Sequence, residues 1–149
     1  MSSLDVIRNE LDSRIINPDF KDLKDIFEWF SGIEIIDIKQ YYEFSDDCYC
    51  RVPLIVNTQY ELLLCCWMPG QLAPFHGHPE QGCLVKILEG TMTETIKYTD
   101  GRAETRLNRT GDVAYISDKI GIHQVQNNSD RNAVSLHLYA PGGYKPDYT

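Results

Sequence analysis

The sequence has no long apolar run and no excess of positive charge, and these absences exclude two classes of function. Without such a run a membrane span is not expected, and the N-terminus lacks the basic start and apolar stretch of a signal peptide, which favours a cytoplasmic protein. Lysine and arginine total 14 against 22 acidic residues, giving a formal net charge of -8. An acidic surface repels phosphate backbones, so nucleic acid is not an expected partner.

The sequence does not predict a disulfide framework. The five cysteines form an odd set in a chain without signs of secretion, which argues against structural disulfides. Cys48 and Cys50 have the spacing of a metal-binding pair, but no second cysteine pair follows to complete a four-cysteine zinc site. Cys65 and Cys66 lie in an apolar run and are interpreted as small buried residues.

The N-terminal part, residues 1–33, is predicted to be helical. Apolar residues recur at helical spacing after possible caps at Ser2 or Ser3: Leu4, Ile7, Leu11 and Ile15. A second helical segment is expected to begin near Asn17-Pro18-Asp19 and to stop at Gly32. We expect both to cover a sheet edge or one end of a barrel.

Residues 42–141 show short apolar, β-branched and aromatic runs separated by turn signals. The predicted strands include Glu61–Trp67, Gly82–Leu88, Thr91–Tyr98, Val113–Ile116 and Ala133–Tyr139. The segment from Tyr98 to Arg109 is interpreted as a short loop. Such spacing indicates a mainly β fold, a small antiparallel β-barrel or jelly roll with N-terminal helices. No linker or repeat interrupts the pattern, so residues 1–149 are expected to form a single domain.

The segment Pro74-Phe75-His76-Gly77-His78 is the sharpest candidate for chemistry. Residues two apart on a strand point to the same face, so both imidazoles can reach one ion while Gly77 faces away. Taken alone, two such histidines are more often a partly exposed surface pair than a metal site.

The surrounding residues strengthen the metal interpretation because they resemble the two motifs of the cupin superfamily. The first motif is matched from His76 to Gly90, and the second by Gly111, Gly121, His123 and Asn127. Three of the four histidines therefore fall at cupin ligand positions: His76, His78 and His123. Cys83 stands where most cupins place a glutamate ligand.

The replacement of an acidic ligand by Cys83 has a chemical consequence. A divalent ion held by three neutral imidazoles keeps its charge and several open positions, so an anionic thiolate can join it. Zinc remains an alternative. With Cys83 as a fourth ligand it would form a closed structural site, and with water as the fourth ligand it would suggest hydrolysis or hydration.

More closely, the chain resembles the thiol dioxygenase family of the cupins, and within it the cysteine dioxygenases. The resemblance runs from about Tyr49 to Pro141. Its motifs are Tyr49-Cys50-Arg51, Cys65-Cys66-Trp67, the run from Cys83 to Gly90, Ala114 to Asp118 with Gly121 to His123, and Val134 to Tyr139. The last of these is the most specific to the family.

The resemblance implies roles for individual residues. His76, His78 and His123 would bind Fe(2+), while Arg51 pairs with the substrate carboxylate beside Tyr49. Tyr139 would place its hydroxyl near that carboxylate, with Ser135 and His137 orienting it. In part of the family, the cysteine and tyrosine at the positions of Cys83 and Tyr139 are joined by a thioether crosslink.

The residue types and their spacing are consistent with these roles, but they also allow ordinary structural roles for the same residues. Ser135, His137 and Tyr139 alternate along one strand and can hydrogen-bond to one another, which also describes an ordinary polar network in the core. Most arginines on strands are solvated, yet Arg51 offers a guanidinium that matches a carboxylate in bidentate fashion. The resemblance adds that a relative that prefers mercaptopropionate lacks this arginine, which implies that its presence favours an amino-acid substrate.

Our hypothesis is an iron(II)-dependent oxidation of L-cysteine by O2 to cysteine sulfinic acid, a step of cysteine catabolism, by a monomeric enzyme. Three alternatives stay open. The substrate could be another small thiol, 3-mercaptopropionate or cysteamine. The protein could be a non-catalytic cupin that binds a metal or small ligand, or a metal-dependent isomerase of a sugar-like substrate.

Overall fold

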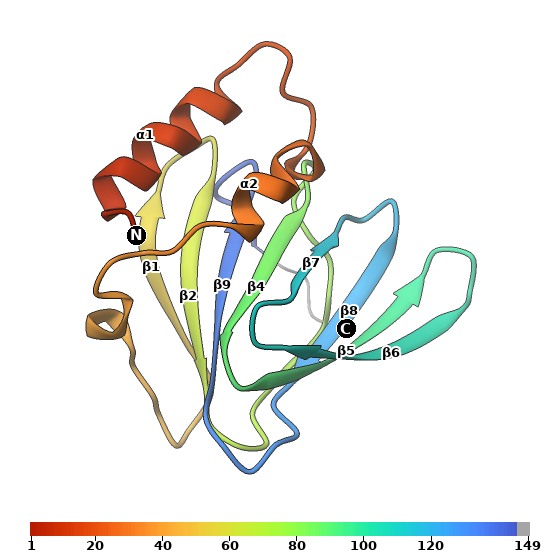
Figure 1. Ribbon diagram of the computed structural model, residues 1–149. Helices are drawn as coiled ribbons and strands as arrows, with labels where there is room; N and C mark the ends of the chain where they lie inside the picture. The colour runs from red at the N-terminus through yellow and green to blue at the C-terminus, as the bar shows by residue number, and fades with distance from the viewer. Residues whose placement is uncertain (146–149) are drawn as a thin grey trace.

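A computed structural model describes residues 1–145 of the chain, and the last four residues of the predicted domain, 146–149, lie outside the described part. Figure 1 shows a β-rich molecule with its helices gathered in the N-terminal part. The helical elements are α1 (Leu4–Ile15), η1 (Leu23–Ile26), α2 (Phe27–Ser31) and η2 (Ile38–Tyr41). The strands are β1 (Cys50–Val56), β2 (Glu61–Trp67), β3 (Leu72–His76), β4 (Cys83–Glu89), β5 (Thr91–Tyr98), β6 (Ala103–Arg109), β7 (Val113–Ile116), β8 (Gly121–Gln126) and β9 (Ala133–Tyr139).

The strands form two antiparallel sheets, in the orders β1-β2-β9-β4-β7 and β3-β8-β5-β6. A core lies between them: Cys65, Trp67, Cys83 and Ile87 of the first sheet pack in one cluster with Met92, Ile96 and Val125 of the second. Within residues 1–145 the two sheets share no strand. The jelly-roll form of the prediction is therefore confirmed, whereas a closed barrel is not formed.

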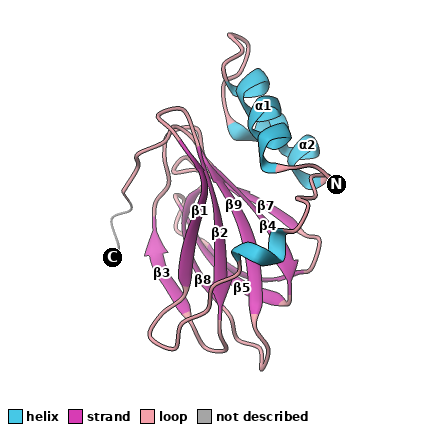
Figure 2. Cartoon of the chain, turned by 90° about the vertical axis from the view of Figure 1, so that its left-hand side faces the viewer, coloured by secondary structure: helices cyan, strands magenta, loops and turns pink. Residues whose placement is uncertain are grey.

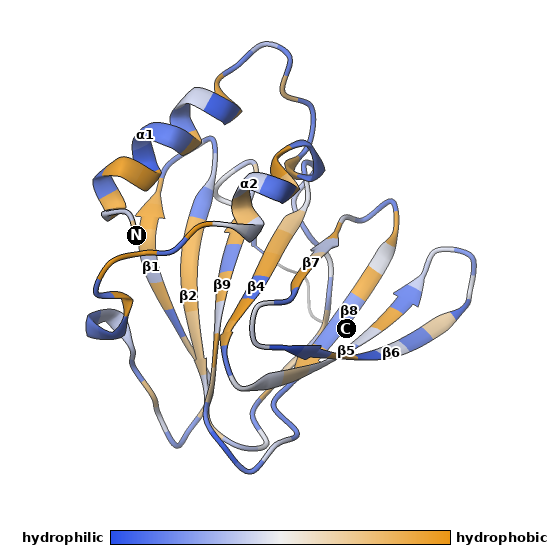
Figure 3. Ribbon diagram, in the orientation of Figure 1, coloured by the Kyte–Doolittle hydropathy of each residue, from blue (hydrophilic) through white to orange (hydrophobic). Residues whose placement is uncertain are grey.

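The N-terminal helices cover the outer face of the five-stranded sheet (Figure 2), where the sequence predicted that they would cover a sheet edge or a barrel end. Ile7 and Leu11 belong to the same buried cluster as Leu62, Leu64 and Leu136, which alternate with the residues facing the inner core. The outer face of this sheet is apolar, and Figure 3 shows long hydrophobic stretches along β2 and β4, so a second layer must bury that face. No helix within residues 1–145 has the length and apolarity needed to span a membrane.

Of the two predicted helix starts, the first is confirmed and the second is wrong. Ser3 caps α1 by accepting a hydrogen bond from the Val6 backbone N–H, as the sequence predicts. The second segment does not begin near Asn17-Pro18-Asp19. It begins at Leu23, where Asp22 and Asp25 form a capping box. Gly32 follows the last helical residue, in agreement with the prediction.

The predicted loop from Tyr98 to Arg109 is wrong. It contains β6, which pairs with β5 along its whole length, from Thr91 opposite Arg109 to Lys97 opposite Ala103. β6 is the edge of the four-stranded sheet, and six of its seven residues are exposed. Because it buries no face, it lacks the apolar alternation by which strands are recognised in a sequence.

Candidate metal centre

A β-bulge in β3 determines which residue faces β8. Ala73 pairs with Val125, but His76 pairs with His123, so one extra residue is inserted on β3 between the two pairs. Without it, Phe75 would stand opposite His123. Pro74 occupies the bulge, where its missing N–H does not break a ladder hydrogen bond. The bulge therefore brings two imidazoles directly across from each other.

His78 reaches the same point from the loop after β3. The strand ends at His76, so the two histidines do not lie on one strand as the spacing predicts. The backbone N–H of His78 donates to Asp118 Oδ1 at 2.8 Å. A Cβ at Gly77 would lie 2.9 Å from the same oxygen, so a glycine allows Asp118 to approach closely.

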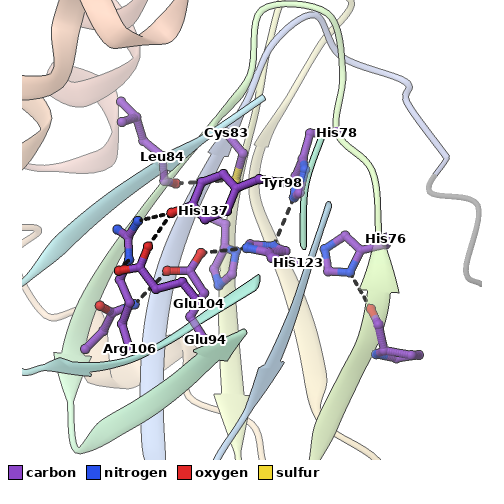
Figure 4. A network of polar contacts seen from close by, with 12 residues as sticks. His76, His78, Cys83, Leu84, Glu94, Tyr98, Glu104, Arg106, His123 and His137 are labelled. Carbon is purple, nitrogen blue, oxygen red and sulfur yellow. Dashed lines mark hydrogen bonds and ion pairs between the residues drawn. The ribbon is translucent and has the colours of Figure 1, made fainter. Parts of the chain in front are cut away.

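The three imidazoles converge in the interior, as Figure 4 shows. His76, His78 and His123 are 7%, 2% and 3% exposed, and their candidate ligand atoms lie within 4.8 Å of one another. His78 Nε2 and His123 Nε2 are 3.0 Å apart. That is the separation of two nitrogens each bound at about 2.1 Å to one ion, at a right angle. The predicted triad is brought together.

The outer nitrogens of two rings are held so that Nε2 takes the ligand role. His76 Nδ1 donates to the Pro74 carbonyl at 2.6 Å, and His123 Nδ1 donates to Glu94 Oε2 at 2.7 Å. His78 Nδ1 is buried and has no hydrogen-bond partner among the described residues. The spacing of the two Nε2 atoms, with a third imidazole within reach, is the arrangement that a divalent ion needs, so the cluster fits a metal ion.

Burial favours the neutral form of His76 and His78, which is the form that binds metals. Burial, followed by the charge of His123, lowers the pKa of His76 to about 4. The same causes hold the pKa of His78 far below its ordinary value. Burial raises the pKa of Glu94, but the hydrogen bond and charge of His123 outweigh this effect and leave the carboxyl pKa lowered.

Cys83 is near the histidines but is not part of their cluster within residues 1–145. Its side chain is 1% exposed, and burial, with Cys65 and Glu94 nearby, raises the pKa of the thiol well above its ordinary value. A protonated thiol outside the cluster does not complete a closed zinc site of three histidines and one cysteine.

A chain of hydrogen bonds leads from Trp67 to Tyr139. Trp67 Nε1–H donates to Ser135 Oγ at 3.0 Å, and Ser135 Oγ lies 2.6 Å from His137 Nε2. Burial lowers the pKa of His137 well below its ordinary value, so the ring is neutral. His137 Nδ1 lies 3.2 Å from the Tyr139 oxygen. Ser135, His137 and Tyr139 therefore form one hydrogen-bonded row along β9.

Arg51 and Tyr49 lie on the same side of the five-stranded sheet as this chain. Arg51 is exposed as a residue, but its guanidinium carbon lies 5.8 Å from the centre of the Tyr139 ring. Its positive charge contributes to the lowered pKa of both His76 and His137. Tyr49 stacks on Trp67 with ring centroids 4.1 Å apart. The guanidinium thus stands at a solvent-accessible side of the centre.

Cys83 and Tyr139 are directly opposite each other in the β4–β9 pair. Side chains opposed in this way have Cβ atoms about 4.5–5.5 Å apart. The Tyr139 phenol opposes, through a hydrogen bond to the thiol, the rise that burial causes in the pKa of Cys83. The two residues predicted to be crosslinked are therefore neighbours.

The model of one protein family, cysteine dioxygenase type I, matches residues 22–145. The chain belongs to this family. Over 93 residues it is 37% identical to cysteine dioxygenase type 1 of Bos taurus, a match that covers 57% of this chain and 46% of that protein. The human protein of the same name gives the same identity and coverage. The chain spans about half the length of the curated relatives it matches.

Solved structures support the fold alone. The protein TT1209 from Thermus thermophilus superposes with a TM-score of 0.62 and 24% identity, over 73% of this chain and 98% of that one. A Klebsiella pneumoniae protein with a double-stranded β-helix domain gives a TM-score of 0.66 and 16% identity, over 79% and 98%. These neighbours confirm the cupin fold. The family and the three-histidine cluster together imply a non-haem metal site.

Sequence reasoning about this family member missed three residues that support the centre. Trp67 begins the hydrogen-bond chain, Asp118 holds His78, and Glu94 binds His123. Glu94 alone had a clear signal, because it alternates with Met92 and Ile96 on the buried face of β5. An acidic residue at an inward position needs a partner. The other two depend on contacts between distant segments.

We expect His78→Ala to abolish metal binding and His137→Ala to preserve it. Both side chains are buried histidines, 2% and 5% exposed, but only His78 belongs to the cluster. Iron content after anaerobic reconstitution, measured by atomic emission, separates them. Equal loss in the two variants, or stoichiometric iron in His78→Ala, would contradict the assignment.

Proposed function

We propose that this chain is a thiol dioxygenase that uses iron(II) to oxidise L-cysteine with O2 to cysteine sulfinic acid. The observation that carries the proposal is the convergence of three imidazoles, with the Arg51 guanidinium close enough to lower the pKa of His76 and to lie over the Tyr139 ring. Membership in the cysteine dioxygenase type I family supports it. The reaction adds both oxygen atoms to one sulfur and needs no further reductant.

His76, His78 and His123 would hold the iron. When bound, iron(II) supplies the redox chemistry that joins O2 to the substrate sulfur. The three rings contribute no negative charge, so the centre can accept an anionic thiolate that a carboxylate ligand would repel. Cys83, at the position where most cupins have that carboxylate, is protonated and stays outside the cluster.

Arg51 and Tyr139 would bind the substrate carboxylate through hydrogen bonds. A guanidinium offers parallel N–H donors that match a carboxylate, and a bidentate pair fixes orientation as well as adding affinity. Burial raises the pKa of Tyr139 well above its ordinary value, so its hydroxyl keeps its proton. A protonated phenol is a hydrogen-bond donor for a carboxylate. Held in this way, the thiol is positioned at the metal.

The alternatives differ in what they predict for thiols and oxygen. Cysteamine has no carboxylate, and 3-mercaptopropionate has no amine, so each tests one end of the proposed contact with cysteine. A non-catalytic cupin would bind metal and consume no oxygen. Cytoplasmic location and a monomeric state stay predictions.

Oxygen uptake by the iron-loaded protein tests the proposal. With L-cysteine we expect one O2 consumed per cysteine sulfinic acid formed, detected by chromatography of the product. His76→Ala, which removes one imidazole of the triad, is expected to form none. The proposal fails if the iron-loaded protein yields no sulfinate, or if the variant yields as much.

Replacing Arg51 by alanine should reduce kcat/KM for cysteine about 10- to 100-fold, the value of one or two charge-assisted hydrogen bonds. Oxidation of cysteamine should change little, because that thiol has no carboxylate for the guanidinium. Arg109→Ala, a change at an exposed position on β6, is the matched control. Equal losses with the two thiols would show that Arg51 does not contact the carboxylate.

The opposed positions of Cys83 and Tyr139 support a thioether crosslink between Cys83 Sγ and a ring carbon of Tyr139. The new bond removes one hydrogen from each partner, and O2 takes the two electrons. After turnover, intact-mass analysis should show a population lighter by two hydrogen atoms. Cys83→Ala should abolish this population and Cys65→Ala should retain it. A mass shift that survives Cys83→Ala would assign the link elsewhere.

A further inference from the structure

Glu94 is a carboxylate buried against one of the three histidines. Its side chain is 3% exposed, and it lies on β5 between the buried Met92 and Ile96. Ile96 pairs with His123, so Glu94 is the diagonal neighbour of His123 on the same face of the sheet. An ionised carboxylate in such a place is costly unless it is paired.

Both oxygens of Glu94 are engaged. Oε2 accepts from His123 Nδ1 at 2.7 Å, and Oε1 accepts from Asn108 Nδ2 at 3.2 Å. Asn108 lies on β6 and is itself diagonal to Glu94, because it pairs with Met92. Figure 4 shows the carboxylate held between β6 and the His123 ring. The edge strand thus fixes the rotamer of a residue that touches a candidate metal ligand.

The hydrogen bond determines the tautomer of His123. An ionised carboxylate can only accept, so His123 Nδ1 carries a proton. In the neutral ring that binds a metal, Nε2 is then the acceptor, and it lies 3.0 Å from His78 Nε2. His123 is therefore held with its lone pair toward the cluster before any ion arrives.

We propose that Glu94 is a positioning residue that acts through His123 and supplies the negative charge that a direct carboxylate ligand would otherwise give to the metal. This inference rests on the metal centre of the proposed function. The charge lies behind a ligand, where it raises the basicity of the imidazole and the affinity for a cation. It occupies no coordination position, so the positions that an anionic thiolate needs stay open.

A purely structural role makes a different prediction. If Glu94 only satisfies buried polar groups, its replacement by glutamine changes stability and leaves metal affinity unchanged, because the amide oxygen can still accept from His123. If it supplies charge, the isosteric amide weakens metal binding while the fold persists.

The test compares Glu94→Gln with Glu104→Gln by titration of the metal-free proteins with Co(II), followed by visible absorption. Glu104 lies on β6, is half exposed and contacts Tyr98 and Arg106, so its change alters net charge equally without touching a histidine. We expect Kd to rise about 10- to 100-fold in Glu94→Gln, as for other groups behind metal ligands, and to stay within about twofold in Glu104→Gln. Equal Kd values for Glu94→Gln and the unmodified protein would overturn the proposal.

Two further measurements keep the outcome interpretable. His123→Ala is titrated in parallel: if it binds Co(II) as the unmodified protein does, the metal centre itself is wrong. If it loses binding while Glu94→Gln does not, only the role of Glu94 fails. Should Glu94→Gln not fold, ¹⁵N NMR of the unmodified metal-free protein still decides. The proposal requires a proton on His123 Nδ1, and a proton on Nε2 instead would refute it.

Discussion

Three buried imidazoles aimed at one point impose the constraint on which the rest of this structure depends. A neutral imidazole has one donor and one acceptor, so with Nδ1 of His76 and of His123 donating outward, their Nε2 atoms present lone pairs to the centre. A cation at the centre resolves the arrangement. The bulge at Pro74, the contact of Asp118 with the His78 backbone and the Glu94 carboxylate all maintain this geometry.

The two sheets provide different residues of the candidate site. The four-stranded sheet provides His76 on β3 and His123 on β8, while the five-stranded sheet provides Arg51 on β1 and Tyr139 on β9. The candidate metal ligands and the proposed substrate contacts thus meet across the interior of the sandwich. The N-terminal helices pack on the opposite face of the five-stranded sheet, and their contribution is to stabilise that sheet rather than to touch the centre. The proposed site therefore depends on how the two sheets are placed relative to each other.

The sequence predicted the elements whose residues bury a face. β2, β5, β7 and β9 have the predicted bounds, because each combines apolar or β-branched residues with a clear turn on either side. β6 was not predicted as a strand because it is a polar edge strand. The second helical segment was placed too early because Asn17 binds the Asp19 backbone in a turn of its own, which imitates a cap. Propensity and spacing cannot distinguish these cases without tertiary contacts.

For the site, spacing and resemblance found the three histidines, Arg51 and the row from Ser135 to Tyr139, all of which the structure brings together. They could not find the bulge that sets His76 opposite His123, since register depends on both strands. The inward position of Glu94 on β5 could have marked it as a buried acid in need of a partner. Its contact with His123 could not have been predicted from the sequence.

The most direct test of the account is the metal environment before and after substrate, measured by X-ray absorption at the iron edge of the anaerobic protein. The account predicts imidazole nitrogens and no sulfur in the resting protein, then a single sulfur neighbour once L-cysteine is added. Sulfur already bound in the resting protein, or none after cysteine is added, would contradict it.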